Sequence, residues 1–289
     1  MNHDPGALDI GAVLQWAARA LAPVAHRPHA EAERLLAAAL HVERTAILAH
    51  PEWTLSSEQW QVFASQVRRR AAGTPLPYIL GDIEFFGHRF TVTPDVLIPR
   101  PETELLVERA LVWTAAHPVH TMVDIGTGSG CIAISLALAE PGRRVIATDI
   151  SMAALCVAQA NARHHSVTNS LQVMQSDLLS ALRGPLDLIV SNPPYVADTE
   201  WDTLPYSVRQ EPTQALLSGP AGLDAIRRLL DQARHRLAVR GCLLVEIGAA
   251  QGNAARALAQ TAFPKATVKI LSDLANRDRL LEVARPRGQ

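Results

Sequence analysis

The stretch Asn192-Pro193-Pro194-Tyr195 combines residue types that can bind and orient a flat amine. It follows the apolar run 187–191, which is typical of a buried parallel strand. Each proline lacks a backbone N–H and has a restricted φ, so the neighbouring carbonyls stay free to accept hydrogen bonds. Asn192 precedes a proline and is disfavoured in the α region. Its side-chain amide and a nearby carbonyl can then face one cleft, which suits the two coplanar donors of an –NH2 group. The same residues are also typical of a plain strand-ending turn.

A glycine-rich loop ends an earlier apolar run and opens a helix; its residues are Asp124, Ile125, Gly126, Thr127, Gly128, Ser129 and Gly130. Glycines allow a tight turn and let a ligand approach the backbone. The third glycine comes one residue too early for the dinucleotide pattern GxGxxG, whose last position is Cys131 here. The acid at the start of the loop would repel a pyrophosphate but suits a cationic amino-acid group. Asp124 can also simply cap nearby backbone N–H groups.

Two more carboxylates follow the next apolar runs. Asp149 lies 23 positions after Gly126, where a carboxylate accepts hydrogen bonds from ribose hydroxyls. Asp177 can accept from an adenine exocyclic amine, with Leu178 against the ring. These positions predict a ligand with an adenosine, a free ribose diol and a cationic tail. S-adenosylmethionine fits this description better than NAD does.

The chain from 102 onward alternates helical and strand patterns, which predicts a doubly wound, mostly parallel α/β sheet. In such sheets ligands bind beyond the carboxyl ends of the strands, where all the segments above fall. The expected helices span 102–116, 130–139, 152–164, 222–238 and 250–260. The expected strands span 121–125, 143–148, 171–174, 186–191, 241–247, 267–272 and 279–284.

The chain before residue 99 is organised differently. Apolar residues at three- and four-residue spacing predict helices over 7–22, 29–41, 44–50 and 56–72, the last capped by Ser56 or Ser57. Alternating aromatic and polar residues predict a β-hairpin over 78–92 that turns at Gly87-His88. We therefore expect a helical domain over 1–76, a hairpin linker over 77–98 and an α/β domain over 99–289.

The bulk composition excludes several classes of protein. The 289 residues are 48% hydrophobic and 19% charged with net charge −1, which is typical of a globular protein and gives no field that attracts nucleic acid. The three cysteines, Cys131, Cys156 and Cys242, lie in apolar contexts without CxxC spacing, so we expect buried free thiols and no metal. The N-terminus lacks a secretory signal and no apolar run is long enough to span a membrane. We expect a cytoplasmic monomer.

Taken together, the glycine loop, Asp149 and the Asn-Pro-Pro-Tyr stretch resemble the class I S-adenosylmethionine-dependent amino-methyltransferases. More narrowly, the chain resembles the bacterial release factor glutamine methyltransferase family. Three further segments carry this resemblance: 77–87 with Pro77-Tyr78 and Phe85-Phe86-Gly87, 96–104 with Pro99-Arg100-Pro101-Glu102, and 211–224 with Glu211-Pro212 and Gly222-Leu223-Asp224. One departure is Leu178, where relatives often carry an aromatic residue.

The resemblance implies that residues 99–289 form an S-adenosylmethionine-dependent methyltransferase domain with a seven-stranded sheet, and that residues 1–76 form a substrate-recognition domain. It also implies a protein substrate, the glutamine of the Gly-Gly-Gln loop of class I peptide chain release factors. Asn192 and Pro193 would hold the –NH2 protons, with Tyr195 packed on the amide or closing the pocket. Pro194, Arg100 and Glu211 would contact the substrate, although Arg100 also fits a plain helix start. A ribosomal-protein glutamine, and less so a nucleic-acid adenine, remain alternative substrates of the same chemistry. A non-enzymatic module that only binds S-adenosylmethionine is disfavoured, because Asn192 and Tyr195 are intact.

Overall fold

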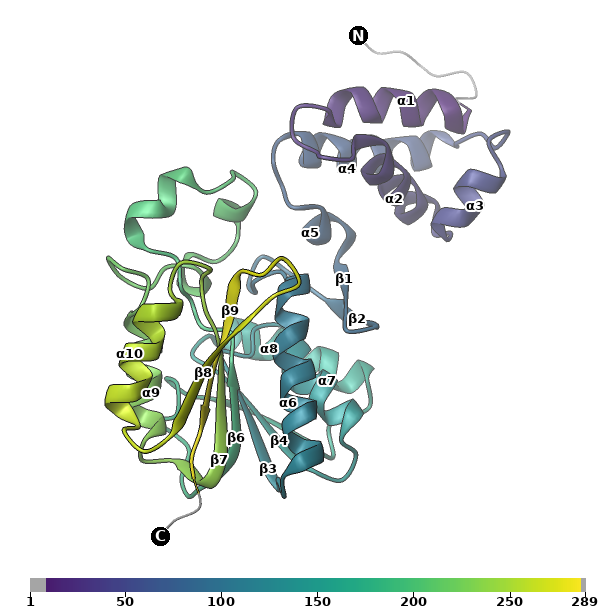
Figure 1. Cartoon of the computed structure of the whole chain (residues 1–289). Coiled ribbons are helices and arrows are strands. Elements are labelled where there is room, and N and C mark those ends of the chain that lie inside the picture. The colour runs from purple at the N-terminus through teal and green to yellow at the C-terminus, as the bar shows by residue number, and fades with distance from the viewer. Residues whose placement is uncertain (1–8, 287–289) are drawn as a thin grey trace. The chain divides into compact units, whose positions relative to one another are not determined.

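The computed structural model describes residues 9–286 and divides the chain into two compact units (Figure 1). One unit contains residues 1–81 together with 205–210, and the other contains 82–204 and 211–289. A short piece of the second half of the chain is therefore part of the N-terminal unit.

The N-terminal unit is helical, with α1 (Ile10–Leu21), α2 (Pro28–Leu40), α3 (Arg44–Ala49), α4 (Ser57–Ala71) and α5 (Leu76–Leu80). The four helices expected between 7 and 72 are present, although the first residues of the first one lie outside the described part. The Ser56 side chain accepts from the backbone N–H of Gln59, whose side chain accepts from the Ser56 N–H in return. This capping box fixes the start of α4 as the sequence predicted.

Tyr206 packs on the helical unit at Gly73, just after α4. Gly73 has φ +97°, and a Cβ built there would lie 2.3 Å from the Tyr206 ring. Only glycine fits this position, because both the backbone conformation and the aromatic contact exclude a side chain. The residues of the 205–210 segment thus pack as part of this unit.

The hairpin is shorter than the expected 78–92, because residues 76–80 form helix α5. Pro77 in the first turn of this helix favours helical φ. Strands β1 (Asp82–Phe85) and β2 (His88–Thr91) follow, and the turn is Phe86-Gly87 rather than Gly87-His88. Both turn residues have positive φ, 50° and 74°, as a two-residue hairpin turn requires. Phe85 and Phe90 are buried in the core of the α/β unit, to which the hairpin therefore belongs.

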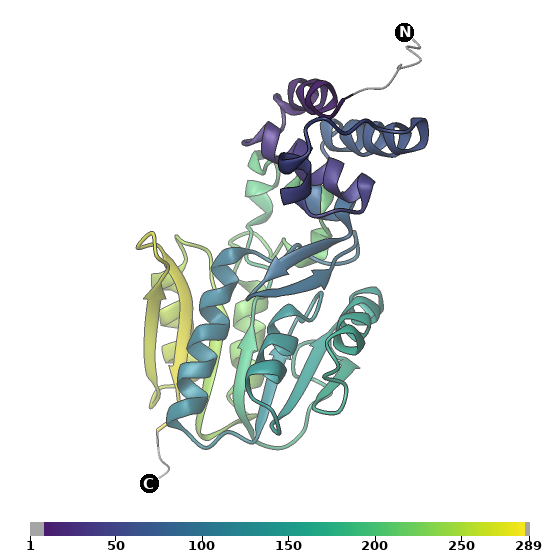
Figure 2. The same ribbon diagram turned by 90° about the vertical axis from the view of Figure 1, so that its right-hand side faces the viewer.

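The sheet of the α/β unit has the strand order β5-β4-β3-β6-β7-β9-β8. Its strands are β3 (Thr121–Ile125), β4 (Arg144–Asp149), β5 (Leu171–Gln175), β6 (Leu186–Ser191), β7 (Leu237–Glu246), β8 (Thr267–Ser272) and β9 (Asp278–Ala284). The first five in spatial order are parallel, and β9 runs antiparallel to both neighbours. Strands β8 and β9 form the yellow edge in Figure 2. The expected doubly wound, mostly parallel, seven-stranded sheet is confirmed.

Helices cover both faces of this sheet (Figure 1). Helices α6 (Glu104–Ala116), α7 (Cys131–Ala139) and α8 (Met152–His164) contribute to one buried core. Helices α9 (Asp224–Ala233) and α10 (Gly252–Ala262) contribute to a second core. Short 3-10 turns η1 (Pro101–Thr103), η2 (Asp198–Thr203), η3 (Val208–Gln210) and η4 (Thr213–Ala215) lie in the connections.

The expected helix 222–238 is too long, since α9 ends at Ala233 and β7 begins at Leu237 rather than at 241. Leu237 lies four positions after Ala233, so it continues the helical apolar spacing. It instead pairs with Leu186 of β6 before a register shift in the ladder. The tertiary pairing overrides the local pattern.

The cysteines are free, as expected, but they are not all buried. Cys131 and Cys242 are buried, and Cys156 is exposed. Cys156 lies on the solvent face of α8 between the buried Leu155 and Val157, which corrects the expectation for this thiol. Within residues 9–286, no helix combines the length and apolarity needed to cross a membrane.

Candidate active site

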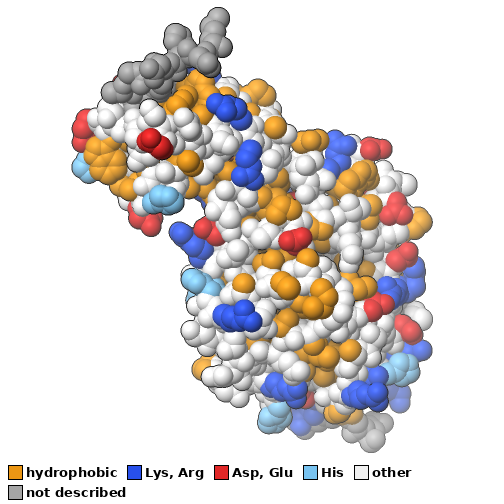
Figure 3. All heavy atoms as spheres, turned by 180° about the vertical axis from the view of Figure 1, so that it is seen from behind, with side chains coloured by type: hydrophobic (Ala, Val, Ile, Leu, Met, Phe, Trp, Pro, Cys, Tyr) orange, Lys and Arg blue, Asp and Glu red, His pale blue; other side chains and the backbone are white. Residues whose placement is uncertain are grey.

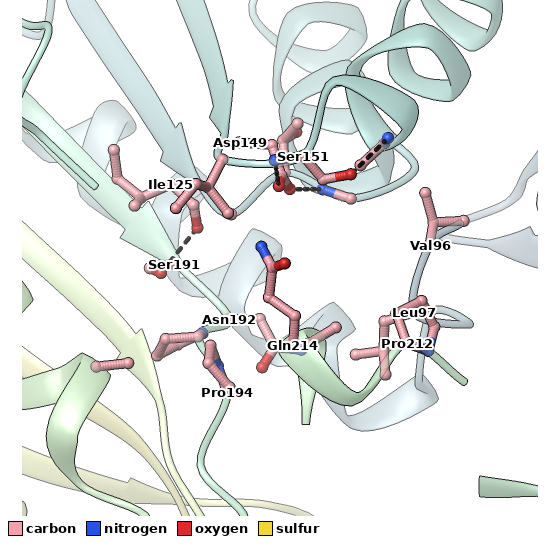
Figure 4. A pocket seen from close by; sticks show the side chains of 18 of the residues that line it. Val96, Leu97, Ile125, Asp149, Ser151, Ser191, Asn192, Pro194, Pro212 and Gln214 are labelled. Carbon is pink, nitrogen blue, oxygen red and sulfur yellow. Dashed lines mark hydrogen bonds between the residues drawn. The ribbon is translucent and has the colours of Figure 1, made fainter. Parts of the chain in front are cut away.

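A cavity of about 460 Å³ opens at the carboxyl ends of β3, β4 and β6 in the α/β unit (Figure 4). The strand order reverses there, since the chain passes from β3 to β4 on one side and later reaches β6 on the other. Ten of the predicted site residues line it: Gly126, Thr127, Gly128, Ser129, Asp149, Asp177, Leu178, Asn192, Pro193 and Pro194. Five do not: Arg100, Asp124, Gly130, Tyr195 and Glu211.

The glycine loop curves so that two of its glycines face open space. Gly126 and Gly128 have φ of 72° and 55°, and a Cβ on either would meet nothing within 4 Å. Gly130 has a different role, because a Cβ there would lie 3.0 Å from Ile134 and 3.2 Å from Ala158. The first two glycines leave room for a ligand, and the third permits close packing of α7 and α8.

Asp124 lies beneath this loop rather than in the cavity wall. One carboxylate oxygen accepts hydrogen bonds from the Thr127 hydroxyl (2.6 Å) and from the Ala133 N–H (3.2 Å). The other oxygen is buried without a hydrogen-bond partner among the described residues. Burial raises the pKa of Asp124 to about 7, although these hydrogen bonds oppose the shift. The carboxylate thus caps backbone and hydroxyl donors, and its unpaired oxygen is a source of negative potential under the loop.

Asp149 at the end of β4 shapes the cavity with both oxygens. One accepts from the Gly128 N–H (3.0 Å) and the other from the Ser151 N–H (2.9 Å) (Figure 4). Each carboxylate oxygen has two lone pairs, so capacity remains for ligand hydroxyls.

Asp177 and Leu178 follow β5 and line the same cavity. Asp177 is half exposed and forms an ion pair with Arg228 on α9 at 2.5 Å, a partner that the sequence pattern did not predict. Leu178 has φ +52°, and the Ser176 hydroxyl donates to its carbonyl at 2.7 Å. Its side chain packs on the core formed with α9 and α10.

Asn192 is the first residue after β6, and it lines the cavity (Figure 4). The preceding Ser191 is tied to β3, because its hydroxyl donates to the Ile125 carbonyl at 2.8 Å. The Asn192 Nδ2 donates to the Thr103 hydroxyl at 3.1 Å, and within residues 9–286 no hydrogen bond occupies the amide oxygen, which is an acceptor. Further along, the Gln251 amide donates to the Tyr195 carbonyl (2.9 Å).

Tyr195 is turned away from the cavity. Its hydroxyl donates to Glu246 at the end of β7, at a long distance of 3.4 Å. Burial, with the nearby Glu246 charge as the next cause, raises the pKa of Tyr195 to about 12. In this structure Tyr195 is therefore not among the residues that line the cavity.

Arg100 and Glu211 bind each other. The Arg100 guanidinium donates to one Glu211 oxygen at 2.5 Å, and the Ile98 N–H donates to the other at 3.0 Å. Glu211 is buried, while its neighbour Pro212 lines the cavity. The pair thus anchors two loops at the cavity rim.

Several residues of the site were not predicted from the sequence. Asn161 on α8 donates to the carbonyls of Ser129 and Thr91 and accepts from the Thr91 N–H, which joins the glycine loop to the hairpin. Gln214 points into the cavity (Figure 4). Thr103 and Glu246 contact the Asn192 turn from behind. A signal for Glu246 was available, because it is an acid that directly follows the apolar run 242–245 of β7.

The sheet order, the open glycine loop and the cavity at the switch point define a class I methyltransferase fold. A family model described as the PrmC N-terminal domain matches residues 12–81, and one described as a methyltransferase small domain matches residues 102–210. The solved hMettl16 catalytic domain in complex with MAT2A 3'UTR hairpin 6 is similar with TM-score 0.56 at 19% identity. That match spans 78% of this chain and 82% of that chain, and it shows the likeness of fold alone.

The sequence relatives are more specific. The release factor glutamine methyltransferase of Moorella thermoacetica is 46% identical over 254 residues, which covers 88% of this chain and 90% of that protein. The enzyme of the same name from Cereibacter sphaeroides is 44% identical over 257 residues, covering 89% and 91%. The chain belongs to the release factor glutamine methyltransferase family, as the sequence motifs indicated.

Proposed function

We propose that this enzyme transfers a methyl group from S-adenosylmethionine to the side-chain nitrogen of the Gly-Gly-Gln glutamine in class I release factors. The observation that carries the proposal is the Asn192 amide. Its nitrogen is bound to Thr103, and within residues 9–286 no hydrogen bond occupies its oxygen, which is an acceptor in a cavity built for a methyl donor. The identity to release factor glutamine methyltransferases supports the choice of substrate.

The residues present fit S-adenosylmethionine. Gly126 and Gly128 leave open space where side chains would fill the cavity, and Asp149 keeps free lone pairs for ribose hydroxyls. Asp177 lines the cavity for the adenine amine, and the unpaired oxygen of Asp124 favours a cation near the loop. When bound, S-adenosylmethionine supplies a methyl group on a positively charged sulfur.

The chain's own contribution is to orient the substrate amide. An amide nitrogen is a weak nucleophile because its lone pair is delocalised into the carbonyl. The Asn192 oxygen and the Pro193 carbonyl accept the two N–H groups and direct the lone pair along the cavity. Positive charge grows on this nitrogen during transfer, so the acceptors bind the transition state more strongly than the ground state. The methylated nitrogen then loses one proton to water, which gives the neutral N-methyl amide. Positioning of this kind contributes up to roughly 7–11 kcal/mol in well-oriented reactions.

Mass spectrometry of the loop peptide from a purified release factor tests this proposal. Incubation with the enzyme and S-adenosylmethionine should add one methyl group to the glutamine. A factor with that Gln→Ala substitution is the control for position, and Asn192→Ala is the control for chemistry. Asn192→Ala should bind the cofactor with unchanged affinity by calorimetry and lose turnover. Equal methylation of the Gln→Ala factor would refute the proposed target.

Two other substrates share this chemistry. A ribosomal-protein glutamine would use the same two acceptors, so purified ribosomal proteins belong in the same assay as a competing substrate. A nucleic-acid adenine is less favoured, because the chain has net charge −1 and the face in Figure 3 carries basic and acidic side chains interspersed. Methylation of RNA or DNA at a rate above that of the release factor would favour this alternative.

We further propose that the helical unit contributes to recognition of the release factor. Its exposed apolar side chains include Leu48 and Val62, which are 56% and 49% exposed. Leu48→Ser and Val62→Ser should raise KM for the release factor while kcat and the affinity for S-adenosylmethionine stay unchanged. Val112→Ser on α6, where the side chain is also 56% exposed, is the matched control in the α/β unit. An equal KM for all three variants and the wild type would contradict this role.

A further inference from the structure

Asn161 on α8 binds two segments of the chain through a single buried side chain. Its Nδ2 donates to the Ser129 carbonyl (2.8 Å) and to the Thr91 carbonyl (2.9 Å), and its Oδ1 accepts from the Thr91 N–H (2.9 Å). A flipped amide would lose all three bonds, so the amide has one stable orientation. The side chain is 1% exposed, and water therefore does not compete for these partners.

Both segments contribute to the wall of the cavity that contains the glycine loop. Ser129 belongs to this loop and lines the cavity. Thr91 ends β2, and residues 95–97 of the connection that follows it also line the cavity (Figure 4). Asn161 is not among the lining residues. One buried amide thus joins two parts of the cavity wall from outside the cavity.

The connection over residues 92–98 is anchored at both ends. Asn161 holds Thr91, the residue directly before it, and the Ile98 N–H at its end donates to the buried Glu211 carboxylate at 3.0 Å. The part of the wall that this connection forms therefore takes its position from these two anchors.

Helix α8 also supports the glycine loop by packing. Gly130 follows Ser129 and has φ +83°, and a Cβ on Gly130 would lie 3.2 Å from Ala158. Ala158 and Asn161 are three positions apart, so they lie on one face of α8. This face sets the loop at two successive residues, by a close contact at Gly130 and by a hydrogen bond at Ser129.

We propose that Asn161 is a positioning residue that holds the glycine loop and the connection 92–98 at the separation that S-adenosylmethionine requires. The inference rests on the proposed binding of this cofactor and extends it to a residue outside the cavity. Because both parts of the wall are fixed before the ligand arrives, binding does not have to order them, and the affinity is higher. Loss of the amide should therefore weaken cofactor affinity more than it lowers kcat at saturating cofactor.

Asn161→Asp tests this role with the least change of shape. The carboxylate can still accept from the Thr91 N–H, but in its ionised form it has no donor for the two carbonyls. We expect the Kd for S-adenosylmethionine, measured by calorimetry, to rise about tenfold, with kcat at saturating cofactor within about threefold of the wild type. The added negative charge by itself favours a cationic ligand, so a weaker affinity reports the loss of the donors. A Kd within about twofold of the wild type would overturn the proposal.

Asn161→Ala is the second variant, because it removes the donors without adding a charge, and its Kd should rise at least as much. Thr114→Val is the matched control for a general loss of stability. The buried Thr114 hydroxyl on α6 donates to Glu140 (2.5 Å), and Thr114 is outside the cavity lining, so its Kd should equal that of the wild type. Equal weakening in all three variants would overturn the proposal, since affinity would then follow stability alone.

Hydrogen exchange provides a readout that a merely structural role would not move. None of the β2 residues, 88–91, lines the cavity, so the cofactor can slow amide exchange in β2 only through the protein. In the wild type, saturating S-adenosylmethionine should slow this exchange, because the ligand holds the glycine loop and Asn161 links the loop to Thr91. Asn161→Ala should lose this effect at its own saturating cofactor concentration. Slowing of equal size in Asn161→Ala would also overturn the proposal.

The same measurements separate this inference from the proposed function. A wild type that binds S-adenosylmethionine and methylates the release factor, beside Asn161 variants of unchanged Kd, refutes only the positioning by Asn161. A wild type that does not bind S-adenosylmethionine refutes the proposed cofactor, and the inference fails with it.

Discussion

Gly222 lies against the backbone of Tyr195 so closely that a Cβ on Gly222 would be 2.2 Å from the Tyr195 carbonyl oxygen. The Gln251 amide donates to this carbonyl (2.9 Å) and to the Gly222 carbonyl (3.1 Å). The Asn-Pro-Pro-Tyr turn is thus held at its far end by a glycine and a glutamine from later parts of the chain.

Gly222→Ala should displace this turn, because the methyl group clashes with backbone and Gly222 has φ +67°. We expect a destabilisation on the order of 1–3 kcal/mol and a larger loss in kcat than in S-adenosylmethionine affinity. Steady-state kinetics and calorimetry give the two quantities. Gly142→Ala is a matched control, since Gly142 also has positive φ and a Cβ there meets nothing within 4 Å. An equal effect of both substitutions on kcat would contradict the role assigned to the contact.

Asp124→Asn should stabilise the ligand-free protein at pH 8. The folded-state pKa of Asp124 is raised from 3.8 to about 7, so the folded state binds the proton more tightly than the unfolded state does. Stability from this group is present at acid pH and is lost as the pH rises from about 4 to about 7. Asparagine at position 124 does not ionise, so the variant does not lose this stability. We expect its free energy of unfolding to exceed that of the wild type by about 1–3 kcal/mol at pH 8, and the difference should disappear near pH 4.

Thermal unfolding of both proteins across this pH range checks the gain. The same substitution should weaken S-adenosylmethionine binding roughly tenfold, because it removes a negative charge beneath the loop. A variant that is less stable than the wild type at pH 8 would show that the ionised carboxylate is better solvated than its burial indicates.

Arg100→Met should destabilise the protein, because it leaves the buried Glu211 carboxylate without its cation. We expect a cost on the order of 3 kcal/mol at pH 8 in urea unfolding. The double variant Arg100→Met with Glu211→Gln should recover part of the loss. Additive effects of the two substitutions would show that the pair does not interact.

Asn161→Ala should be among the more damaging substitutions in the α/β unit. It removes three hydrogen bonds of 2.8–2.9 Å, so the Thr91 N–H, the Thr91 carbonyl and the Ser129 carbonyl lose their partner. We expect a loss on the order of 2–4 kcal/mol. Asn169→Ala, at an exposed position, should change stability by less than about 0.5 kcal/mol. Chemical unfolding of the two variants provides the comparison.

The sequence predicted the parts of the site that follow strands. Asn192, Asp149 and the glycine loop lie where their strands end, because parallel strands bring their carboxyl ends to one edge of the sheet. Secondary structure was also predicted well wherever capping residues are local, as at Ser56. These features depend on short-range chemistry that a single sequence displays.

The remaining features depend on pairing between distant segments. Asp177 binds Arg228, and Glu211 binds Arg100, 111 positions away. Tyr195 faces Glu246 instead of the cavity because the sheet order brings β7 beside β6. The start of β7 at Leu237 is likewise set by its ladder with β6 and not by local periodicity. The sequence lists the charged residues and the strands, but it does not show which residues form ion pairs or which strands pair with each other.

The helical unit is assembled from two stretches of chain, 1–81 and 205–210, with Tyr206 packed at Gly73. The chain therefore passes from one unit to the other three times, after residues 81, 204 and 210. Anyone who grafts this unit onto another catalytic scaffold must transplant both stretches. A transplant of the first stretch alone would expose Gly73 to solvent, and Tyr206 would remain in the original protein without its packing partner.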